Sequence, residues 1–275
     1  MVQWEPIAGL TFRPALEYAM RSPLYNLPNF RGELNFTPNN PFYPDFIGPE
    51  EGFERHRAFT FSFDFSYQLG QRFRMKRGER IDEHSNLPKV YAEYRKGLPI
   101  LGAVTDFDFL TIGFGSETDW GSWGFSKADL SLGGFYSDKR VEFIDFKHFN
   151  GIQTLFLQST LDPWSSVRQF GTLPYYDFST SEGFVEFHLD HDFRGSLWKE
   201  MPWVGQLNWS FIGGANYLYT EEYGHFTELF FGLDRIFGLF RVQVMVPLPR
   251  PRNARFPMRF GMTIRHDFYW KNRRR

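Results

Sequence analysis

The feature that most constrains this chain is a strict alternation of apolar and polar residues between Ala58 and Gly70. The stretch reads AFTFSFDFSYQLG, so every second residue is Phe, Tyr or Leu and the residues between them are mostly polar. A β-strand points successive side chains to opposite faces, whereas a helix would scatter these rings around its cylinder. The stretch therefore predicts a strand with one apolar face and one mostly polar face.

The same period of two recurs along most of the chain and predicts about twelve strands. Their expected bounds are 4–20, 29–37, 57–73, 87–96, 109–117, 122–136, 167–179, 182–193, 207–220, 225–234, 239–248 and 257–268. Residues 37–46 and 137–166 are predicted to be loops, and 197–207 a short interfacial helix. No linker or shift in composition divides the sequence, so we expect a single domain over residues 1–275.

Composition narrows the class of protein further. Aromatic residues make up 20% of the chain, yet charged residues make up 23% and the mean hydropathy is −0.42. Such a chain is too aromatic to stay disordered, and it has no run of roughly 18 uncharged apolar residues that would span a bilayer as a helix. The net charge of −1 gives no electrostatic case for binding nucleic acid. The absence of cysteine excludes disulfides, zinc-thiolate sites and thiol catalysis.

Two architectures suit a long series of alternating strands. A soluble sandwich or barrel buries its apolar face, whereas a transmembrane barrel turns apolar residues to lipid and polar residues to its lumen. The ring-filled face of residues 58–70 would overfill a soluble core, which must interlock large with small residues. Lipid sets no such limit, and aromatic girdles favour Phe, Tyr and Trp. The predicted fold class is therefore all-β, an antiparallel transmembrane β-barrel of about twelve strands. We expect strand 257–268 to close it by pairing with the first strand, near 4–20.

Six segments of the sequence resemble a known family. They are SYQLGQRF (66–73), EYRKG (93–97), VEFIDFKHFNGIQTLF (141–156), LPYYDFSTSEGFVEFHLDHDFRG (173–195), ANYLYT (215–220) and ELFFGLDRIFGLFRV (228–242). The most specific part is DFKHFNG, because alternation cannot produce so irregular a sequence. The segments are similar to a Bacteroidota family of outer-membrane proteins of unknown function, whose C-terminal barrel is akin to the surface-antigen (Bam/Tam-type) assembly barrels.

The resemblance carries expectations about place and partners. It implies the bacterial outer membrane, with outer-membrane lipid and further outer-membrane or periplasmic proteins as partners. Full-length members carry an N-terminal carboxypeptidase-regulatory-like domain, and this chain resembles only the barrel that follows it. Outer-membrane barrels typically end on an aromatic residue, whereas this sequence continues past Phe268 as YWKNRRR. The family supplies no catalytic residue or cofactor to carry over.

One trio of ionisable residues is the main candidate site. Glu186, His188 and Asp190 alternate along a predicted strand, so their side chains project together. Such a trio can bind a divalent cation or relay protons, but three ligands on one strand rarely complete a metal shell. We therefore favour a polar network in the lumen, in which the trio bonds to inward arginines of neighbouring strands. The arginines expected there are Arg241, Arg259 and Arg265.

A second candidate is the DFKHFNG segment, in which Asp145 and His148 could form a catalytic pair. We favour a loop packed by Phe143, Phe146 and Phe149, because the Asn-Gly pair that ends the segment favours a turn. No G-x-S-x-G motif, phosphate-binding loop or G-x-G-x-x-G motif occurs in the sequence. We predict no catalytic, metal-binding or cofactor-binding residue.

The expected function is that of a non-enzymatic outer-membrane barrel, acting as a scaffold, an assembly factor or a pore. Two alternatives stay open. An outer-membrane lipid-modifying enzyme would carry its active groups at the lipid-exposed rim. A soluble β-sandwich module would use its aromatic residues to bind carbohydrate. Activity on phospholipid separates the enzyme from the scaffold, and solubility without detergent would select the soluble module.

Overall fold

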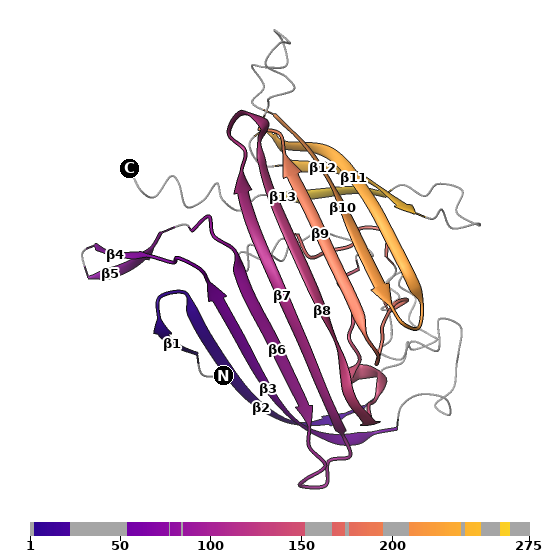
Figure 1. Ribbon diagram of the computed structural model, residues 1–275. Coiled ribbons are helices and arrows are strands. Elements are labelled where there is room, and N and C mark those ends of the chain that lie inside the picture. Colours follow the sequence, from indigo (N-terminus) through magenta and orange to yellow (C-terminus); the bar gives the residue numbers. More distant parts are fainter. Residues whose placement is uncertain are drawn as a thin grey trace, which may run out of the picture.

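The computed structural model describes residues 3–22, 54–76, 78–83, 85–151, 167–173, 176–194, 209–237, 240–248 and 259–264. Within these residues the chain forms one antiparallel sheet of eleven strands and a separate hairpin of two strands (Figure 1). The all-β, antiparallel fold that the alternation predicts is therefore confirmed. In the same residues there is no helix with the length and apolar character needed to cross a membrane.

The strands of the main sheet follow one another along the chain as a meander. They are β1 (Trp4–Ile7), β2 (Leu10–Arg21), β3 (His56–Gln68), β6 (Lys89–Gly97), β7 (Asp106–Asp119), β8 (Phe125–Arg140), β9 (Phe184–Asp192), β10 (Ser210–Thr220), β11 (Gly224–Ile236), β12 (Phe240–Leu248) and β13 (Arg259–Ile264). The separate hairpin consists of β4 (Phe73–Lys76) and β5 (Glu79–Asp82). Two short 3-10 helices, η2 (Gly121–Trp123) and η3 (Phe143–Asp145), follow β7 and β8.

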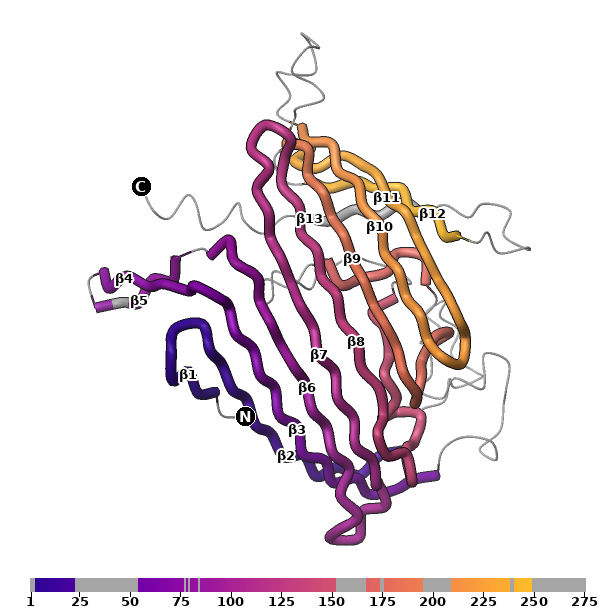
Figure 2. The backbone as a smooth tube through the Cα atoms, in the orientation of Figure 1, coloured from indigo at the N-terminus to yellow at the C-terminus, as the bar shows by residue number. Residues whose placement is uncertain are grey.

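The sheet has an outer and an inner face, which differ in burial. In β7, Phe107, Phe109 and Thr111 are buried, whereas Ile112 and Phe114 are 45% and 44% exposed. Adjacent strands twist relative to one another, so a sheet of this many strands curls. The inner face is the concave one, and described parts of the β8–β9 connection lie inside the curve (Figure 2). We call residues 141–151, 167–173 and 176–183 of that connection the inner segment.

An aromatic core joins the inner segment to the sheet. Its buried members are Phe107, Phe109, Phe149, Phe170, Leu173, Phe184 and Leu218. Phe149 meets Phe184 edge to face, with 5.3 Å between the ring centroids, and Phe170 is fully buried. Burying each such side chain contributes about 1.5–3 kcal/mol. The sheet therefore has its apolar core on the inner side, between its own strands and the inner segment.

The sheet is open within the described residues. β1 and β13 end the strand order, and no described strand pairs with the free edge of either one. We expected the last strand to pair with the first and close a barrel of about twelve strands. Neither that pairing nor a closed sheet is present in the described residues.

The expected strand 4–20 is wrong as a single element, because a turn at Gly9 divides it into β1 and β2. Gly9 has a φ of +81°, a conformation that glycine adopts without steric cost. Its N–H donates to Glu5 Oε1 at 2.9 Å, and its carbonyl accepts from the Gln68 N–H at 2.9 Å. The sequence did not predict this hairpin, because apolar and polar residues alternate on both sides of the turn.

The expected strand 167–179 is also wrong. Its described residues are turns and bends with only isolated bridges to the loop at 147–151, such as Gly151 to Phe170. Phe170 and Leu173 point into the aromatic core, so their spacing reflects burial on an irregular backbone. The expected loop 137–166 begins later than predicted, because β8 continues to Arg140.

The remaining expected elements divide into two groups. Those at 57–73, 87–96 and from 182–193 onward, together with the pair between 109 and 136, correspond to β3 and β6–β13 with shifted ends. The hairpin of β4 and β5 was not expected. The strand at 29–37, the loop at 37–46 and the helix at 197–207 lie outside the described residues.

Candidate functional site

A row of buried polar side chains crosses the inner face of four neighbouring strands. Its members stand opposite one another in the antiparallel register and are Asp129 of β8, His188 of β9, Asn216 of β10 and Glu228 of β11. Their exposed fractions are 1%, 0%, 3% and 0% in that order. Burying polar groups this completely costs free energy unless each one is hydrogen-bonded. The hydrogen-bond partners of the inner polar row therefore determine its role in the structure.

His188 lies at the centre of the inner polar row. Its Nδ1 is 2.8 Å from Asn216 Oδ1 and its Nε2 is 2.9 Å from Glu186 Oε1. The Asn216 amide nitrogen donates to Glu228 Oε1 at 2.7 Å, which directs the amide oxygen toward His188. Both imidazole nitrogens thus lie within hydrogen-bond distance of a side-chain oxygen, so the ring is held in place from both sides.

Glu228 ties the inner segment to the sheet. Its Oε1 accepts from the Gly171 N–H at 2.7 Å, and its Oε2 accepts from the Thr172 N–H and hydroxyl at 2.8 and 2.6 Å. Asn216 is a further donor to the same carboxylate. Hydrogen bonds to an ionised acceptor are stronger than neutral ones. Glu228 therefore holds the main chain at residues 171–172 against β11.

Arg168 anchors the same stretch of the inner segment a few residues earlier. Its Nη2 donates to Asp129 Oδ2 at 2.7 Å, and its guanidinium lies 4.3 Å from the centroid of the Tyr91 ring. The Tyr91 hydroxyl donates to the other oxygen of Asp129 at 2.8 Å. Between the two anchors, Phe170 packs on the His188 ring at 4.7 Å between centroids. Residues 168–172 are thus held by charge, hydrogen bonds and ring packing together.

Asp190 and Arg241 form a separate pair on the inner face. Arg241 Nη2 donates to Asp190 Oδ2 at 2.5 Å, and its Nε donates to Gln243 Oε1 at 3.0 Å. The pair borders a cavity of about 20 Å³ between the inner segment and strands β9 to β12. That volume is about the size of one water molecule. At this position, therefore, the gap between the inner segment and the sheet has room for little more than one water molecule.

The structure describes the side chains of four of the six predicted site residues. Glu186 and His188 lie together in the network around the inner polar row, and Asp190 lies beside it, bonded to Arg241. Arg259 belongs to β13, but its side chain is not among the described ones, and Arg265 lies outside the described residues.

Sequence reasoning missed the residues that carry most of the contacts to the inner segment. Asn216 and Glu228 have inward parity on strands that were predicted, so alternation could have identified them. Arg168 could not be found in this way, because it falls on a segment wrongly expected to be a strand. Its bond to Asp129 joins residues 39 positions apart, and no local pattern reports such a contact.

The DFKHFNG segment is packed as a loop, as expected. Phe143 and Phe146 lie 5.4 Å apart between centroids, and Phe149 belongs to the aromatic core. Asp145 and His148 have different partners: Asp145 binds Arg21 at 2.6 Å, and His148 Nδ1 is 2.7 Å from Ser179 Oγ. These separate partners give no Asp–His pair of the kind that acid–base catalysis uses.

Burial changes the acidity of both residues of this loop. It lowers the pKa of His148 to about 4, and the positive charge of Arg95 adds to that effect. It raises the pKa of Asp145, against the opposing charge of Arg21. His148 is therefore neutral at neutral pH. The described part of the chain contains no group of three or more His, Asp or Glu side chains placed to hold a metal ion.

The outer face differs from the inner one in the exposure of its apolar side chains. Large apolar side chains stand exposed along its strands, namely Leu16, Ile112, Phe114, Leu130, Leu132, Leu229, Phe231 and Val242, with exposed fractions from 37% to 68%. Tyrosines are exposed toward one end of the strands and tryptophans toward the other. The tyrosines are Tyr18, Tyr136 and Tyr223, and the tryptophans are Trp120 and Trp123. We call these the Tyr end, where β2 finishes and β3 begins, and the Trp end, at the β7–β8 turn.

Comparison with known proteins gives one family relationship. A family model described as the C-terminal domain of a family of unknown function (DUF5686) matches residues 1–233. The matched range contains every member of the inner polar row and the whole inner segment. No curated protein and no solved structure matches the chain.

Proposed function

This chain belongs to the DUF5686 C-terminal domain family, whose function is unknown, and we propose from its own geometry that it forms a wall of a β-barrel in the bacterial outer membrane. The inner segment lies against the inner face of that wall. We propose that the protein acts there as a non-enzymatic scaffold or assembly factor. An open pore is less well supported, because two buried anchors hold residues 168–172 across the inner face.

The observation that carries the proposal is the inversion of the two faces. The inner polar row is almost fully buried, whereas Leu132, Phe231 and Leu16 on the outer face are 50%, 51% and 68% exposed. Soluble monomers rarely expose large contiguous apolar surfaces. A membrane barrel requires them, because its outer residues contact lipid while polar residues face its interior.

The ends of the strands support the same proposal. Tyr136 and Trp123 are each 76% exposed, at opposite ends of the sheet. Tyr and Trp are enriched at both interfaces of a membrane, where the ring is apolar and the polar group meets water. Strands β7 (Asp106–Asp119) and β8 (Phe125–Arg140) exceed the roughly 9–11 residues that a spanning strand needs.

A pair of neighbouring residues on β2 tests membrane residence directly. The sequence contains no cysteine, so Leu16→Cys and Glu17→Cys each create a unique labelling site on opposite faces. A fluorophore at position 16 is expected to be quenched by nitroxide-labelled lipids in reconstituted vesicles. A fluorophore at position 17 is expected to be quenched by aqueous iodide instead.

The two labels share the same strand and the same neighbours, so each serves as the control for the other. Equal quenching of both positions by iodide, in a preparation that stays monodisperse without detergent, would refute membrane residence. That result would favour the soluble carbohydrate-binding module.

One observation favours a second candidate function, hydrolysis of a lipid ester at the outer rim. Ser126 Oγ lies 2.7 Å from His191 Nδ1, and His191 Nε2 lies 3.1 Å from the Trp123 carbonyl. Donation from Nε2 to that carbonyl would leave Nδ1 to accept the serine proton, as in a nucleophile–base pair. Labelling of the detergent-solubilised protein with a serine-reactive phosphonate tests this. Loss of label in Ser126→Ala, but not in Ser116→Ala, would select the enzyme over the scaffold.

A further inference from the structure

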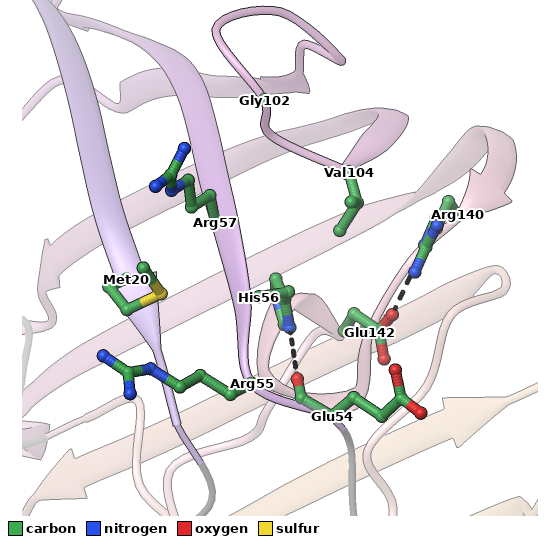
Figure 3. Close-up of a pocket in the computed structure, with 9 residues that line it drawn as sticks. All are labelled: Met20, Glu54, Arg55, His56, Arg57, Gly102, Val104, Arg140 and Glu142. Atoms are coloured by element: carbon green, nitrogen blue, oxygen red, sulfur yellow. Dashed lines mark hydrogen bonds and ion pairs between the residues drawn. The ribbon is translucent and has the colours of Figure 1, made fainter.

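A hollow of about 380 Å³ lies at the Tyr end of the sheet, away from the inner polar row. It is bordered by Met20 at the end of β2, Arg55 and Arg57 around the start of β3, Gly102 in the β6–β7 loop, and Arg140 and Glu142 after β8 (Figure 3). We call it the arginine hollow. Three arginines and two glutamates, Glu54 and Glu142, line it, which leaves one positive charge in excess. A local positive charge of this kind favours an anion.

Arg55 and Arg57 supply the excess positive charge of the arginine hollow. Arg140 Nε is 3.7 Å from Glu142 Oε1, and Glu54 lies beside that pair (Figure 3). Among the described residues, neither Arg55 nor Arg57 takes part in an ion pair, and both are exposed. Their guanidinium groups are directed away from the two carboxylates, toward Met20 and the β6–β7 loop (Figure 3).

The β6–β7 loop next to these arginines presents apolar side chains to the surroundings. Ile100 is 48% and Leu101 69% exposed. Leu101 also has a φ of +54°, which is unfavourable for a residue with a branched side chain. Neither burial nor backbone preference explains a leucine at this position.

The loop is fixed in this position by the strands beside it. The Tyr18 hydroxyl donates to the Leu101 carbonyl at 3.1 Å, and the Val104 N–H donates to the Arg57 carbonyl at 3.0 Å. Gly102 follows with a φ of +77°, and a Cβ there would lie 3.3 Å from Arg57 Nη1. The glycine therefore leaves room for the Arg57 guanidinium beside the loop.

We propose that the arginine hollow binds the phosphate of a lipid headgroup, with Arg55 and Arg57 as its ligands and Ile100, Leu101 and Met20 in contact with the acyl chains. Arginine presents a fork of donors that matches a phosphate. Free phosphate would use the same donors but would gain nothing from the apolar side chains around them. The inference rests on the proposed membrane residence and identifies the end of the sheet that lies at headgroup level.

The test measures binding of water-soluble lipids to the detergent-solubilised chain by calorimetry. Dioctanoyl phosphatidylglycerol is expected to bind saturably, whereas inorganic phosphate at the same concentration is not. The double variant Arg55→Gln/Arg57→Gln is expected to bind the lipid at least about tenfold more weakly, since it loses two charge-assisted contacts. Leu101→Ser is expected to weaken lipid binding and leave any residual phosphate binding unchanged.

The matched control is Arg72→Gln/Arg74→Gln, which makes the same change in charge beyond the other end of β3. Equal weakening in both doubles would overturn the arginine hollow as the site and leave only a general effect of charge. Binding of phosphate as tight as that of the lipid would overturn the lipid assignment. The fluorophore at position 16 can be quenched by lipid while Arg55→Gln/Arg57→Gln binds dioctanoyl phosphatidylglycerol normally. In that case the headgroup site is refuted and membrane residence is not. If the fluorophore at position 16 is quenched by aqueous iodide and not by lipid, the proposed membrane residence is refuted together with the headgroup site.

Discussion

The inner and outer faces of this sheet are made by the same alternation, yet they are stabilised in opposite ways. On the inner face, Glu228 and Asp129 are buried and each charge has a defined partner. On the outer face, Leu132 and Phe231 are large, apolar and about half exposed. The inner face is therefore complete within the chain, whereas the outer face depends on the solvent around it. Alternation predicts that two faces exist, and only their burial tells which one the protein turns inward.

The largest expected effect on stability comes from removing the Glu228 carboxylate from the inner face. Replacing Glu228 with Ala leaves the Gly171 and Thr172 donors and the Asn216 amide without their buried acceptor. We expect a loss of about 3–5 kcal/mol in the free energy of unfolding. Urea unfolding in lipid vesicles measures this loss. Hydrogen exchange should show faster exchange of the Gly171 and Thr172 amides.

The control for this change is Glu17→Ala, at an exposed position with inward parity on β2. It is expected to change the free energy of unfolding by no more than about 0.5 kcal/mol. If the two variants are equally stable, or if the amides at 171 and 172 keep their protection in Glu228→Ala, the carboxylate does not hold the inner segment.

A somewhat smaller effect is expected from a charge on the outer face. Replacing Leu132 with Arg should cost about 2–4 kcal/mol if this side chain lies near the middle of a bilayer. In water the same half-exposed position would tolerate Arg within about 0.5 kcal/mol. The free energy of unfolding in phospholipid vesicles distinguishes these outcomes.

Position 136 gives the matched control on the same strand. Tyr136 lies at the Tyr end and is 76% exposed, so Tyr136→Arg should cost only about 0–1 kcal/mol, as at an interface. A cost at 136 that equals the cost at 132 would contradict a membrane whose midplane crosses the centre of β8.

A further expected effect is a pH dependence within the inner segment. Burial holds the pKa of His148 at about 4 in the folded protein, below its ordinary value of 6.5. The unfolded chain therefore binds a proton between these values and the folded chain does not. Stability is expected to fall as the pH decreases from 6.5 toward 4. Urea unfolding across this range measures the slope.

His148→Gln removes the titrating group and is expected to flatten that slope. The raised pKa of Asp145 contributes with the opposite sign, because its stabilising share is present at low pH and is lost as the pH rises. This contribution is common to both proteins and cancels in their difference. An unchanged slope in the variant would show that another group dominates the acid response.

The extent to which the sequence predicts this molecule differs between its elements. The alternation at 57–73 leads directly to β3 (His56–Gln68), and the alternation at 225–234 leads to β11 (Gly224–Ile236). It also assigns Glu186 and His188 to one face. The period of two is a property of each strand by itself, so these features need no knowledge of the rest of the fold.

The features that the sequence does not reveal depend on contacts between distant residues. The turn at Gly9 interrupts a pattern whose parity continues on both sides of it. Glu228 looks like any inward glutamate until Gly171, 57 positions earlier, is placed against it. The pairing that would close the sheet is of the same kind, because it joins opposite ends of the strand order. Alternation determines which way a side chain points but not which partner it meets.

The position of the inner segment in the chain imposes an order on assembly. The segment leaves the sheet after β8 and returns to it at β9. Its anchors Asn216 and Glu228, however, lie on β10 and β11, which are synthesised later. The hairpins of the meander can form one after another from local contacts. The bond from Arg168 to Asp129 needs only β8, but the bonds from Gly171 and Thr172 to Glu228 require that β11 has joined. The contacts that hold residues 171–172 are therefore complete only when a strand that follows them by more than 50 positions is in place.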